Sequence, residues 1–134
     1  MKRLKIGELA RQGGVNLETI RYYERVGLLP RPPRTANGYR IFPDEAQHRL
    51  RFVKRAQELG FSLREIKELL SLRIEPGKTR ADVRERTQAK IEDINKKLRT
   101  LRRMKRALGK LIATCHGDGA VSDCPILEAL DRGD

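Results

Sequence analysis

The chain has 134 residues, which suffices for one small domain or for one binding domain with an extension. Lysine and arginine total 30 against 18 acidic residues, so the formal net charge of +12 favours a polyanionic partner, with a basic surface that only aids solubility as the alternative. No run of about 18 apolar residues is present, which excludes a membrane-spanning helix.

The N-terminal residues contain no apolar signal segment, so we expect a cytoplasmic protein with no membrane partner. In that compartment, two cysteines favour a metal or redox site over a structural disulfide. An enzyme is disfavoured because the chain has no C-x-x-C pair, no phosphate-binding loop and no H-E-x-x-H motif. The composition therefore predicts a binding protein that is not an enzyme.

Two short helices are predicted at the N-terminal end. Residues 6–12 carry apolar positions on one face, and the pair Gly13–Gly14 ends this helix. Asn16 suits the N-cap of a second helix, over residues 17–26, which Ile20 anchors inward. Two helices joined by a tight turn are typical of a helix-turn-helix. Four side chains of the second helix are expected near its outward face, within reach of bases and phosphates: Thr19, Arg21, Tyr22 and Tyr23.

The next segment, residues 28–42, is predicted to be non-helical because Pro30, Pro32 and Pro33 forbid a regular helix. The pair Asn37–Gly38 predicts a tight primed turn with positive φ at both residues, so that residues 34–35 and 39–42 pair as a two-stranded wing. A basic hairpin beside a recognition helix suits a phosphate clamp, and a solvated loop is the alternative. The candidate side chains of the wing are Arg31, Arg34, Tyr39 and Arg40.

Two further helices are predicted after the wing. Pro43 suits the first turn of a helix that continues to Leu59 and ends at Gly60. The segment from Ser62 to Glu65 is a capping box, which begins a helix that ends near residue 73. The inward residues expected from their spacing are Leu50, Val53 and Ala56 or Gln57 on the first helix, and Leu63, Ile66, Leu69 and Leu70 on the second.

Residues 79–113 contain no proline, which predicts one helix of about 50 Å. A stripe of apolar side chains recurs at steps of mostly three and four, with one longer step from Leu101 to Leu108. So small a chain cannot bury this stripe, and we therefore expect a homodimer; packing of the helix on its own N-terminal part is the alternative. The stripe comprises Val83, Thr87, Ile91, Ile94, Leu98, Leu101, Leu108 and Ile112.

The C-terminal segment contains Cys115 and Cys124, separated by eight residues, and Pro125 starts a short final helix. A glycine-rich loop could bring both thiolates to one metal ion, although this spacing exceeds that of zinc ribbons. A sensor that forms a disulfide, and a nonspecific DNA-packing protein, remain alternatives. Three side chains of the loop could supply further ligands: His116, Asp118 and Asp123.

These motifs together resemble the MerR family of transcription regulators. The motifs are Lys5-Ile6-Gly7-Glu8-Leu9-Ala10, Glu18-Thr19-Ile20-Arg21-Tyr22-Tyr23-Glu24, Asn37-Gly38-Tyr39-Arg40 and Leu59-Gly60-Phe61-Ser62-Leu63-Arg64-Glu65-Ile66. The resemblance covers nearly the whole chain. It implies a mainly α fold in which a winged helix-turn-helix is followed by a long dimerisation helix that forms an antiparallel coiled coil. The expected domains are residues 1–75 for DNA binding, 76–113 for dimerisation and 114–134 for a metal-binding loop with a short helix.

The resemblance also implies a function. Such a homodimer binds double-stranded promoter DNA whose spacer is too long, and ligand binding makes it bend and untwist that DNA for RNA polymerase holoenzyme. The DNA-binding residues that it implies, with Arg34 added from the wing and Lys5 the weakest of them, are Lys5, Thr19, Arg21, Tyr22, Arg34, Tyr39 and Arg40.

In the metal-responsive branch of this family, the resemblance assigns the metal to Cys115 and Cys124. Members for mercury, zinc, cadmium or lead add a cysteine at the start of the long helix, and members for Cu(I), Ag(I) or Au(I) have a neutral residue there; Arg80 matches neither. Two thiolates and a monovalent ion leave one negative charge, which a guanidinium can balance, whereas a divalent ion is already neutralised. We therefore expect Cu(I) or Ag(I), as in copper-efflux regulators, with Hg(II) or Zn(II) as alternatives.

Overall fold

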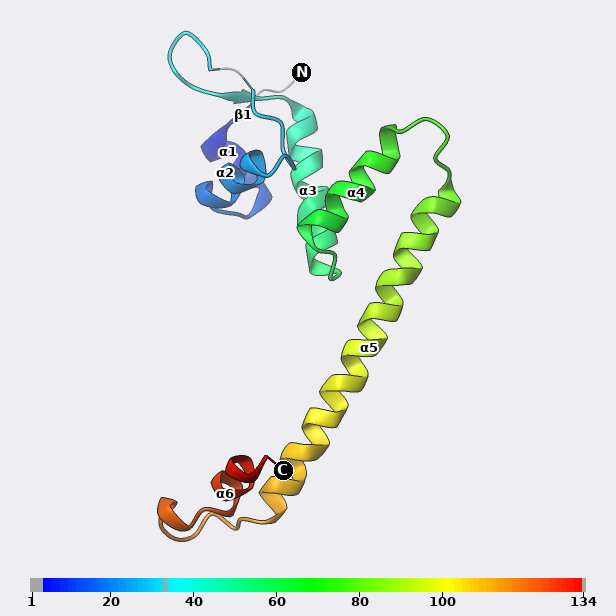
Figure 1. Cartoon of the computed structure of the whole chain (residues 1–134). Coiled ribbons are helices and arrows are strands. Elements are labelled where there is room, and N and C mark those ends of the chain that lie inside the picture. The colour runs from blue at the N-terminus through cyan, green and yellow to red at the C-terminus, as the bar shows by residue number, and fades with distance from the viewer. Residues whose placement is uncertain (1–3, 33, 134) are drawn as a thin grey trace. The chain divides into compact units, whose positions relative to one another are not determined.

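A computed structural model describes residues 4–32 and 34–133 of the chain. The residues outside this description are 1–3, Pro33 and 134. The expected N-terminal domain, with its wing, includes the first four of them, and the expected C-terminal domain includes the last. The chain forms two compact units, residues 1–87 and 88–134, and one helix runs through the boundary between them. The prediction of a mainly α protein is confirmed (Figure 1).

The elements follow one another in the predicted order, with one additional strand at the N-terminal end. They are β1 (Leu4–Lys5), α1 (Ile6–Gly13), α2 (Leu17–Arg25), β2 (Ile41–Phe42), α3 (Asp44–Glu58), α4 (Leu63–Ile74), α5 (Arg80–Ala113), a 3-10 turn (Val121–Asp123) and α6 (Pro125–Arg132).

The first unit has one hydrophobic core, built from α1, α2, α3, α4 and the two short strands. Each large side chain that leaves water there contributes about 1.5–3 kcal/mol. The core packs α2, the second helix of the helix-turn-helix, against α1, and this packing fixes the face that α2 presents to solvent. The largest fully buried side chains are Phe42, Leu4, Leu9, Ile20, Leu28, Leu50, Ile66 and Val53.

Adjacent glycines end α1 for two different reasons. Gly14 has φ of 66°, a left-handed conformation in which its N–H bonds the carbonyls of Ala10 and Arg11. Gly13 still belongs to the helix, but a Cβ there would lie 2.3 Å from Cδ2 of Leu50 on α3. Only a residue without a side chain therefore permits this close approach of α1 and α3.

The predicted wing is only partly right. Ile41–Phe42 pairs antiparallel with Leu4–Lys5, while the hairpin itself keeps a single bridge between Arg34 and Arg40. The turn is not of the primed type, because Gly38 has φ of 83° and no described residue other than glycine has positive φ. Instead, the Gly38 N–H donates to the Thr35 carbonyl and the Thr35 N–H to the Tyr39 carbonyl, as in a three-residue loop closed by a glycine.

Side-chain caps set the starts of α4 and α5. The predicted capping box is confirmed: the Glu65 N–H donates to Ser62 Oγ at 3.2 Å, and the Ser62 N–H donates to Glu65 Oε1 at 2.8 Å. At α5, the Thr79 N–H donates to Asp82 Oδ2 at 2.8 Å, and this backbone bond lowers the pKa of the Asp82 carboxyl. Both helices consequently begin where their sequence motifs predict, to within one residue.

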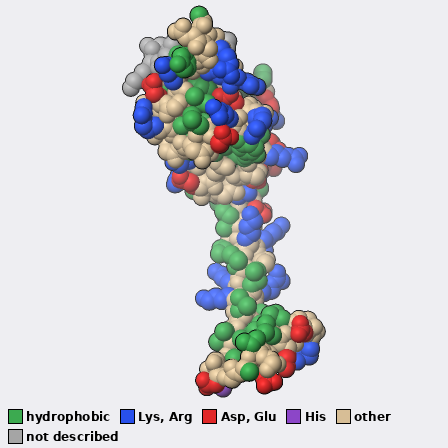
Figure 2. Space-filling model, turned by 90° about the vertical axis from the view of Figure 1, so that its left-hand side faces the viewer, with side chains coloured by type: hydrophobic (Ala, Val, Ile, Leu, Met, Phe, Trp, Pro, Cys, Tyr) green, Lys and Arg blue, Asp and Glu red, His purple; other side chains and the backbone are tan. Residues whose placement is uncertain are grey.

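Helix α5 is continuous over 34 residues, and its apolar stripe lies open in the single chain. Exposure of the large members ranges from 39 % for Ile94 to 66 % for Ile112, and Figure 2 shows green side chains along the helix. Met104, which the predicted stripe omits, is 53 % exposed and lies within the longer step from Leu101 to Leu108. In the described part of the chain, no helix is long and apolar enough to cross a membrane.

Candidate DNA interface and metal-binding loop

The outward face of α2 presents three of the predicted DNA-binding side chains. The Asn16 side chain caps the helix by accepting from the Thr19 N–H at 2.8 Å and from its hydroxyl at 2.9 Å. The side chain of Arg21 is 57 % exposed and pairs with Glu18 at 3.0 Å, an exposed ion pair that is worth about 0–1 kcal/mol and is easily exchanged for a phosphate. Tyr22 is 42 % exposed. These groups can accordingly reach a polyanion without rearrangement of the backbone.

Tyr23 does not join this face, contrary to the prediction that it lies near the outward side. It is buried, and its hydroxyl donates to Gln57 Oε1 on α3 at 2.5 Å. Burial, with a smaller contribution from Tyr22, raises the pKa of the Tyr23 phenol, so the hydroxyl stays protonated as a donor. Tyr23 follows Ile20 by three residues, and this spacing places both on the inward side of α2.

The wing brings together Lys5 and Tyr39, two predicted DNA-binding residues that are far apart in the sequence. The Lys5 ammonium lies 4.5 Å from the centre of the Tyr39 ring, a cation–π contact between β1 and the hairpin. Tyr39 itself is 55 % exposed. Arg34 donates to the Gly38 carbonyl at 2.9 Å, and this bond links the first arm of the hairpin to its turn. Two charges and an aromatic ring thus lie beside the tip of the wing.

Arg40, unlike Arg21, is mostly buried and pairs with a buried carboxylate. Its guanidinium donates to Glu24 Oε2 on α2 at 2.9 Å, and its side chain is 18 % exposed. The Glu24 side chain is only 3 % exposed, and Nε of Arg31 lies 4.0 Å from the same carboxylate oxygen. A buried carboxylate of α2 therefore neutralises two arginines of the wing segment. Sequence reasoning missed Glu24, although it follows the buried Ile20 by four residues and so shares its face.

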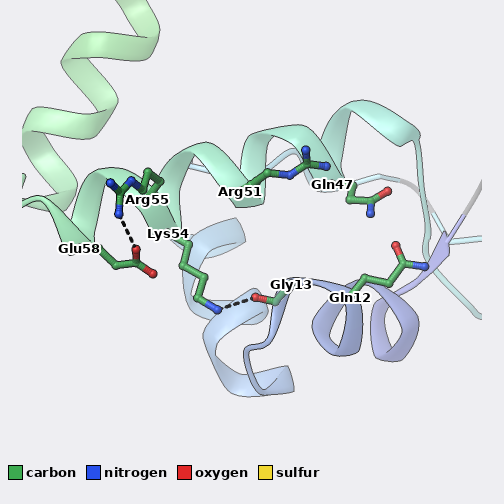
Figure 3. A pocket seen from close by; sticks show the side chains of 7 residues that line it. All are labelled: Gln12, Gly13, Gln47, Arg51, Lys54, Arg55 and Glu58. Carbon is green, nitrogen blue, oxygen red and sulfur yellow. Dashed lines mark hydrogen bonds and ion pairs between the residues drawn. The ribbon is translucent and has the colours of Figure 1, made fainter.

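A polar hollow of about 490 Å³ lies between α1 and α3 (Figure 3). There Lys54 Nζ donates to the Gly13 carbonyl at 3.0 Å, while Arg55 pairs with Glu58 at 3.2 Å. A cation at the C-terminal end of α1 also meets the negative end of the helix dipole. Lys54 consequently ties α3 to α1 at the point where Gly13 lets them approach, a structural role rather than a binding one.

An apolar hollow of about 1010 Å³ lies on the first unit among α3, α4 and the first turns of α5. Its walls include Phe52, Leu59 and Phe61, and two members of the apolar stripe of α5, Val83 and Thr87, border it. Within the first unit, the first residues of the stripe thus lie beside an apolar surface of α3 and α4.

The two cysteines flank the loop between α5 and α6. Cys115 follows the end of α5, where its N–H donates to the Ile112 carbonyl, and Cys124 is the N-cap residue of α6. Both thiols are free and half-buried. Over residues 4–32 and 34–133, no three His, Cys, Asp or Glu side chains converge on a metal-sized site, so His116 and Asp123 do not form such a group with the cysteines. Cys115 and Cys124 are the two sulfur-bearing side chains at the ends of this loop.

Comparison with known proteins shows which family has this architecture. The family model of MerR helix-turn-helix regulatory proteins matches residues 4–72, and the model described as "MerR, DNA binding" matches residues 47–111. The mercuric resistance operon regulatory protein of Bacillus cereus is 46 % identical over 96 % of this chain and 97 % of its own length. The transcriptional regulator HmrR of Rhizobium leguminosarum is 43 % identical over 97 % and 99 %.

Among solved structures, the regulator PbrR691 of Ralstonia metallidurans in complex with lead(II) matches with a TM-score of 0.83 and 32 % identity. The match covers 95 % of this chain and 98 % of that one. Family models, full-length relatives and a structural match all agree with the fold described above, and the chain accordingly belongs to the MerR family of helix-turn-helix transcription regulators.

Proposed function

We propose that the chain is a cytoplasmic, metal-responsive transcription regulator, not an enzyme, which binds promoter DNA as a homodimer and senses a soft metal ion through Cys115 and Cys124. The observation that carries this proposal is the pair of free, half-buried thiols at the two ends of one loop in a MerR-family chain. A relative named for mercuric resistance and a similar structure in complex with lead(II) support a soft-metal ligand for this chain as well.

The proposed DNA contact is made by the outward face of α2 and by the wing. Exposed Arg21 and Tyr22 on α2, with Thr19 beside them, supply groups for base edges and phosphates. In the wing, the exposed ring of Tyr39 and the ammonium of Lys5 offer a phosphate contact. Arg34 and Arg40 contribute positive charge there, and the pairing with Glu24 also makes Arg40 a positioning residue for the wing.

The proposed homodimer rests on α5. Its apolar stripe is exposed along the helix, and an exposed stripe of this length marks a surface that pairs with another. The charge distribution favours antiparallel pairing, because residues 80–93 contain four acidic side chains, whereas residues 94–113 contain none and eight basic ones. Antiparallel helices place the basic half of one beside the acidic side chains of the other, and parallel helices would place two basic halves together.

Two thiolates suit an ion that accepts linear coordination by sulfur. Cu(I) and Ag(I) do so, and the net charge of −1 that results would be balanced by Arg80 if it lies at the site. Hg(II) is the second candidate, since it also binds two thiolates and the relative from Bacillus cereus, 46 % identical, is a mercuric resistance regulator. Zn(II) usually takes four ligands, and the loop itself offers two sulfur atoms. Cys115 and Cys124 would hold the ion, which cross-links the two ends of the loop.

On the promoter, the bound ion would change the dimer while both heads stay on the DNA. Bending and untwisting of an overlong spacer then lets RNA polymerase holoenzyme use both promoter elements. This action requires that the metal site and the DNA heads are separable, so loss of metal binding should not abolish operator binding.

The test is transcription in vitro from an overlong-spacer promoter with Cu(I), Ag(I), Hg(II) and Zn(II) added in turn. We expect induction by a soft ion with the natural chain, and none with Cys115→Ser or Cys124→Ser, while operator affinity stays within about twofold, because the substitutions lie outside the heads. The matched control is Thr114→Ser, adjacent to Cys115. Induction by an oxidant instead of any metal, or loss of operator binding in the cysteine variants, would contradict the proposal.

A further inference from the structure

The C-terminal half of α5 carries an uninterrupted excess of one charge. Residues 94–113 contain eight lysine or arginine side chains and no acidic one, whereas residues 80–93 of the same helix contain four of each. A net charge of +8 is thus concentrated on about 30 Å of helix at a rise of about 1.5 Å per residue. This charge lies outside the winged helix-turn-helix, and the function proposed above uses it only to favour antiparallel pairing of α5.

Most of these basic side chains share one side of the helix. At about 100° per residue, five of them project roughly opposite the apolar stripe and Arg102 lies at its flank; we call the surface formed by these six side chains the cationic face. Two shallow hollows along α5 are lined mainly by the same side chains. The cationic face comprises Lys96, Arg99, Arg102, Arg103, Arg106 and Lys110.

In the described part of the chain, no carboxylate forms an ion pair with the cationic face. The acidic residue nearest in sequence, Asp93, pairs with Lys90 at 3.3 Å and with Lys97 at 3.4 Å, neither of which belongs to the face. Within the described residues, none of the six side chains has a carboxylate oxygen within 4.0 Å. Basic neighbours four residues apart, such as Arg99 with Arg103 and Arg102 with Arg106, repel each other and destabilise the helix on its own.

We propose that the cationic face is a second DNA-binding surface, which holds the phosphate backbone of double-stranded DNA outside the bases read by the heads. Four of its six side chains are arginines, whose planar guanidinium matches phosphate oxygens in a bidentate arrangement. The face spans about 21 Å, which corresponds to about six base pairs at about 3.4 Å per step.

The chemistry of the face favours DNA over an acidic protein. Protein interfaces depend on aromatic and apolar anchors, and the six side chains of the face include none. The same composition predicts binding without sequence preference, because phosphate contacts carry no base information. Pairing of α5 through its apolar stripe would leave the opposite side free, so a homodimer would present two such faces. This inference rests on DNA binding by the family and is independent of metal sensing.

The test compares two triple variants of the full chain that have the same net charge, +12 − 3 = +9. One is Arg99→Gln, Arg102→Gln, Arg106→Gln on the cationic face. The other is Arg64→Gln, Lys78→Gln, Arg84→Gln, which removes three basic side chains elsewhere. Glutamine keeps nearly the helix propensity of arginine, so α5 should form in both. Helix content and thermal unfolding by circular dichroism check this first.

Binding is then measured over a range of salt concentrations, on a long random-sequence duplex and on a short operator duplex. With the long duplex, we expect the slope of log K against log salt to become shallower by about 2.7 in the cationic-face variant, about 0.9 for each phosphate that no longer faces an arginine. The control variant should keep the natural slope, and both variants should keep their preference for the operator. The same slope in both variants would overturn the proposal. So would normal DNA binding combined with a weakened affinity for RNA polymerase, which would assign the face to a protein.

Discussion

The carboxylate of Glu24 lies in the interior of the first unit, where Oε2 accepts from Arg40 and Oε1 has no hydrogen-bond partner among the described atoms. Burying a charge is costly unless it is paired, so this residue holds its position only because wing arginines neutralise it. Glu24 lies on α2 and Arg40 on the wing. The pair therefore links α2 to the wing, the two segments proposed above to contact DNA.

Glu24→Gln should weaken this link. The amide keeps the shape of the side chain but leaves the partly buried guanidinium of Arg40 without a counter-charge, so we expect a loss of about 2 kcal/mol in the free energy of unfolding. Urea denaturation of Glu24→Gln, Arg40→Gln and the double variant measures it. The double variant should lose clearly less than the sum of the two single losses, because both remove the same pair. Strict additivity would show that the two residues act independently.

The sequence predicts the position of some single residues better than that of others. Arg21 and Tyr22 lie on an outward face because the helical period fixes the direction of Ile20, and that period is readable from the sequence. Arg40 was predicted only as a DNA contact, because its partner Glu24 carries a charge that normally indicates exposure. The burial of Glu24 depends on the wing folding over α2, which no local pattern contains.

Secondary-structure elements were predicted most accurately where a side chain or a glycine ends them. Ser62 and Gly14 make their caps through bonds within a few residues, so the end of α1 and the start of α4 follow from short segments. Strand β1 has two residues and no readable period, and it pairs only because β2 lies beside it. The turn at Asn37–Gly38 differs because asparagine there has negative φ and glycine alone supplies the positive value.

The apolar stripe of α5 contains one basic position that has a consequence for self-association. Steps of three and four from Leu98 lead through Leu101 to Lys105 and then to Leu108, so a lysine occupies a regular place in the stripe. A single polar residue at such a place lowers the stability of a coiled coil while it fixes the register.

We expect Lys105→Leu to tighten the homodimer at least tenfold. Each copy would bury one more leucine, worth about 1.5 kcal/mol or more, and a factor of ten corresponds to about 1.4 kcal/mol. Sedimentation of diluted samples gives the dissociation constants, and Lys110→Leu, on the opposite side of the helix, serves as the control with no tightening. A weaker dimer in Lys105→Leu would mean that the ammonium is paired favourably with the second copy.

For the molecule as a whole, sequence reasoning predicted a helix-turn-helix head, a long helix and a cysteine loop; the family models match residues 4–72 and 47–111, and the loop lies beyond the residues that they match. The relation between the cysteines could not be predicted, since eight residues of glycine-rich loop between them have no periodicity. In the homodimer proposed above, the choice of metal would depend on the side chains that both copies bring to the site, and the sequence of one chain does not show how they combine.

The length of α5 has a consequence for the metal site proposed above. Arg80 is the first residue of this helix and Cys115 follows its last turn, so a 34-residue helix, about 50 Å long at about 1.5 Å per residue, lies between them within one chain. If Arg80 balances the charge of the two thiolates, it must come from the other copy, running in the opposite direction. A chain changed at Arg80 and a chain changed at Cys115 would then form one natural site when they pair with each other.

Co-expression of two differently tagged, individually inactive forms tests this. Arg80→Glu and Cys115→Ser should each fail to induce as homodimers, yet a mixed dimer has one site with both natural cysteines and natural Arg80. Purified mixed dimers should bind one ion and regain part of the induction. The control is a double variant, with both substitutions in one chain, paired with the natural chain. This mixed dimer would have no natural site, because each of its two sites would carry one of the two substitutions. Induction by the mixed dimer alone would then show that each metal site contains residues of both copies.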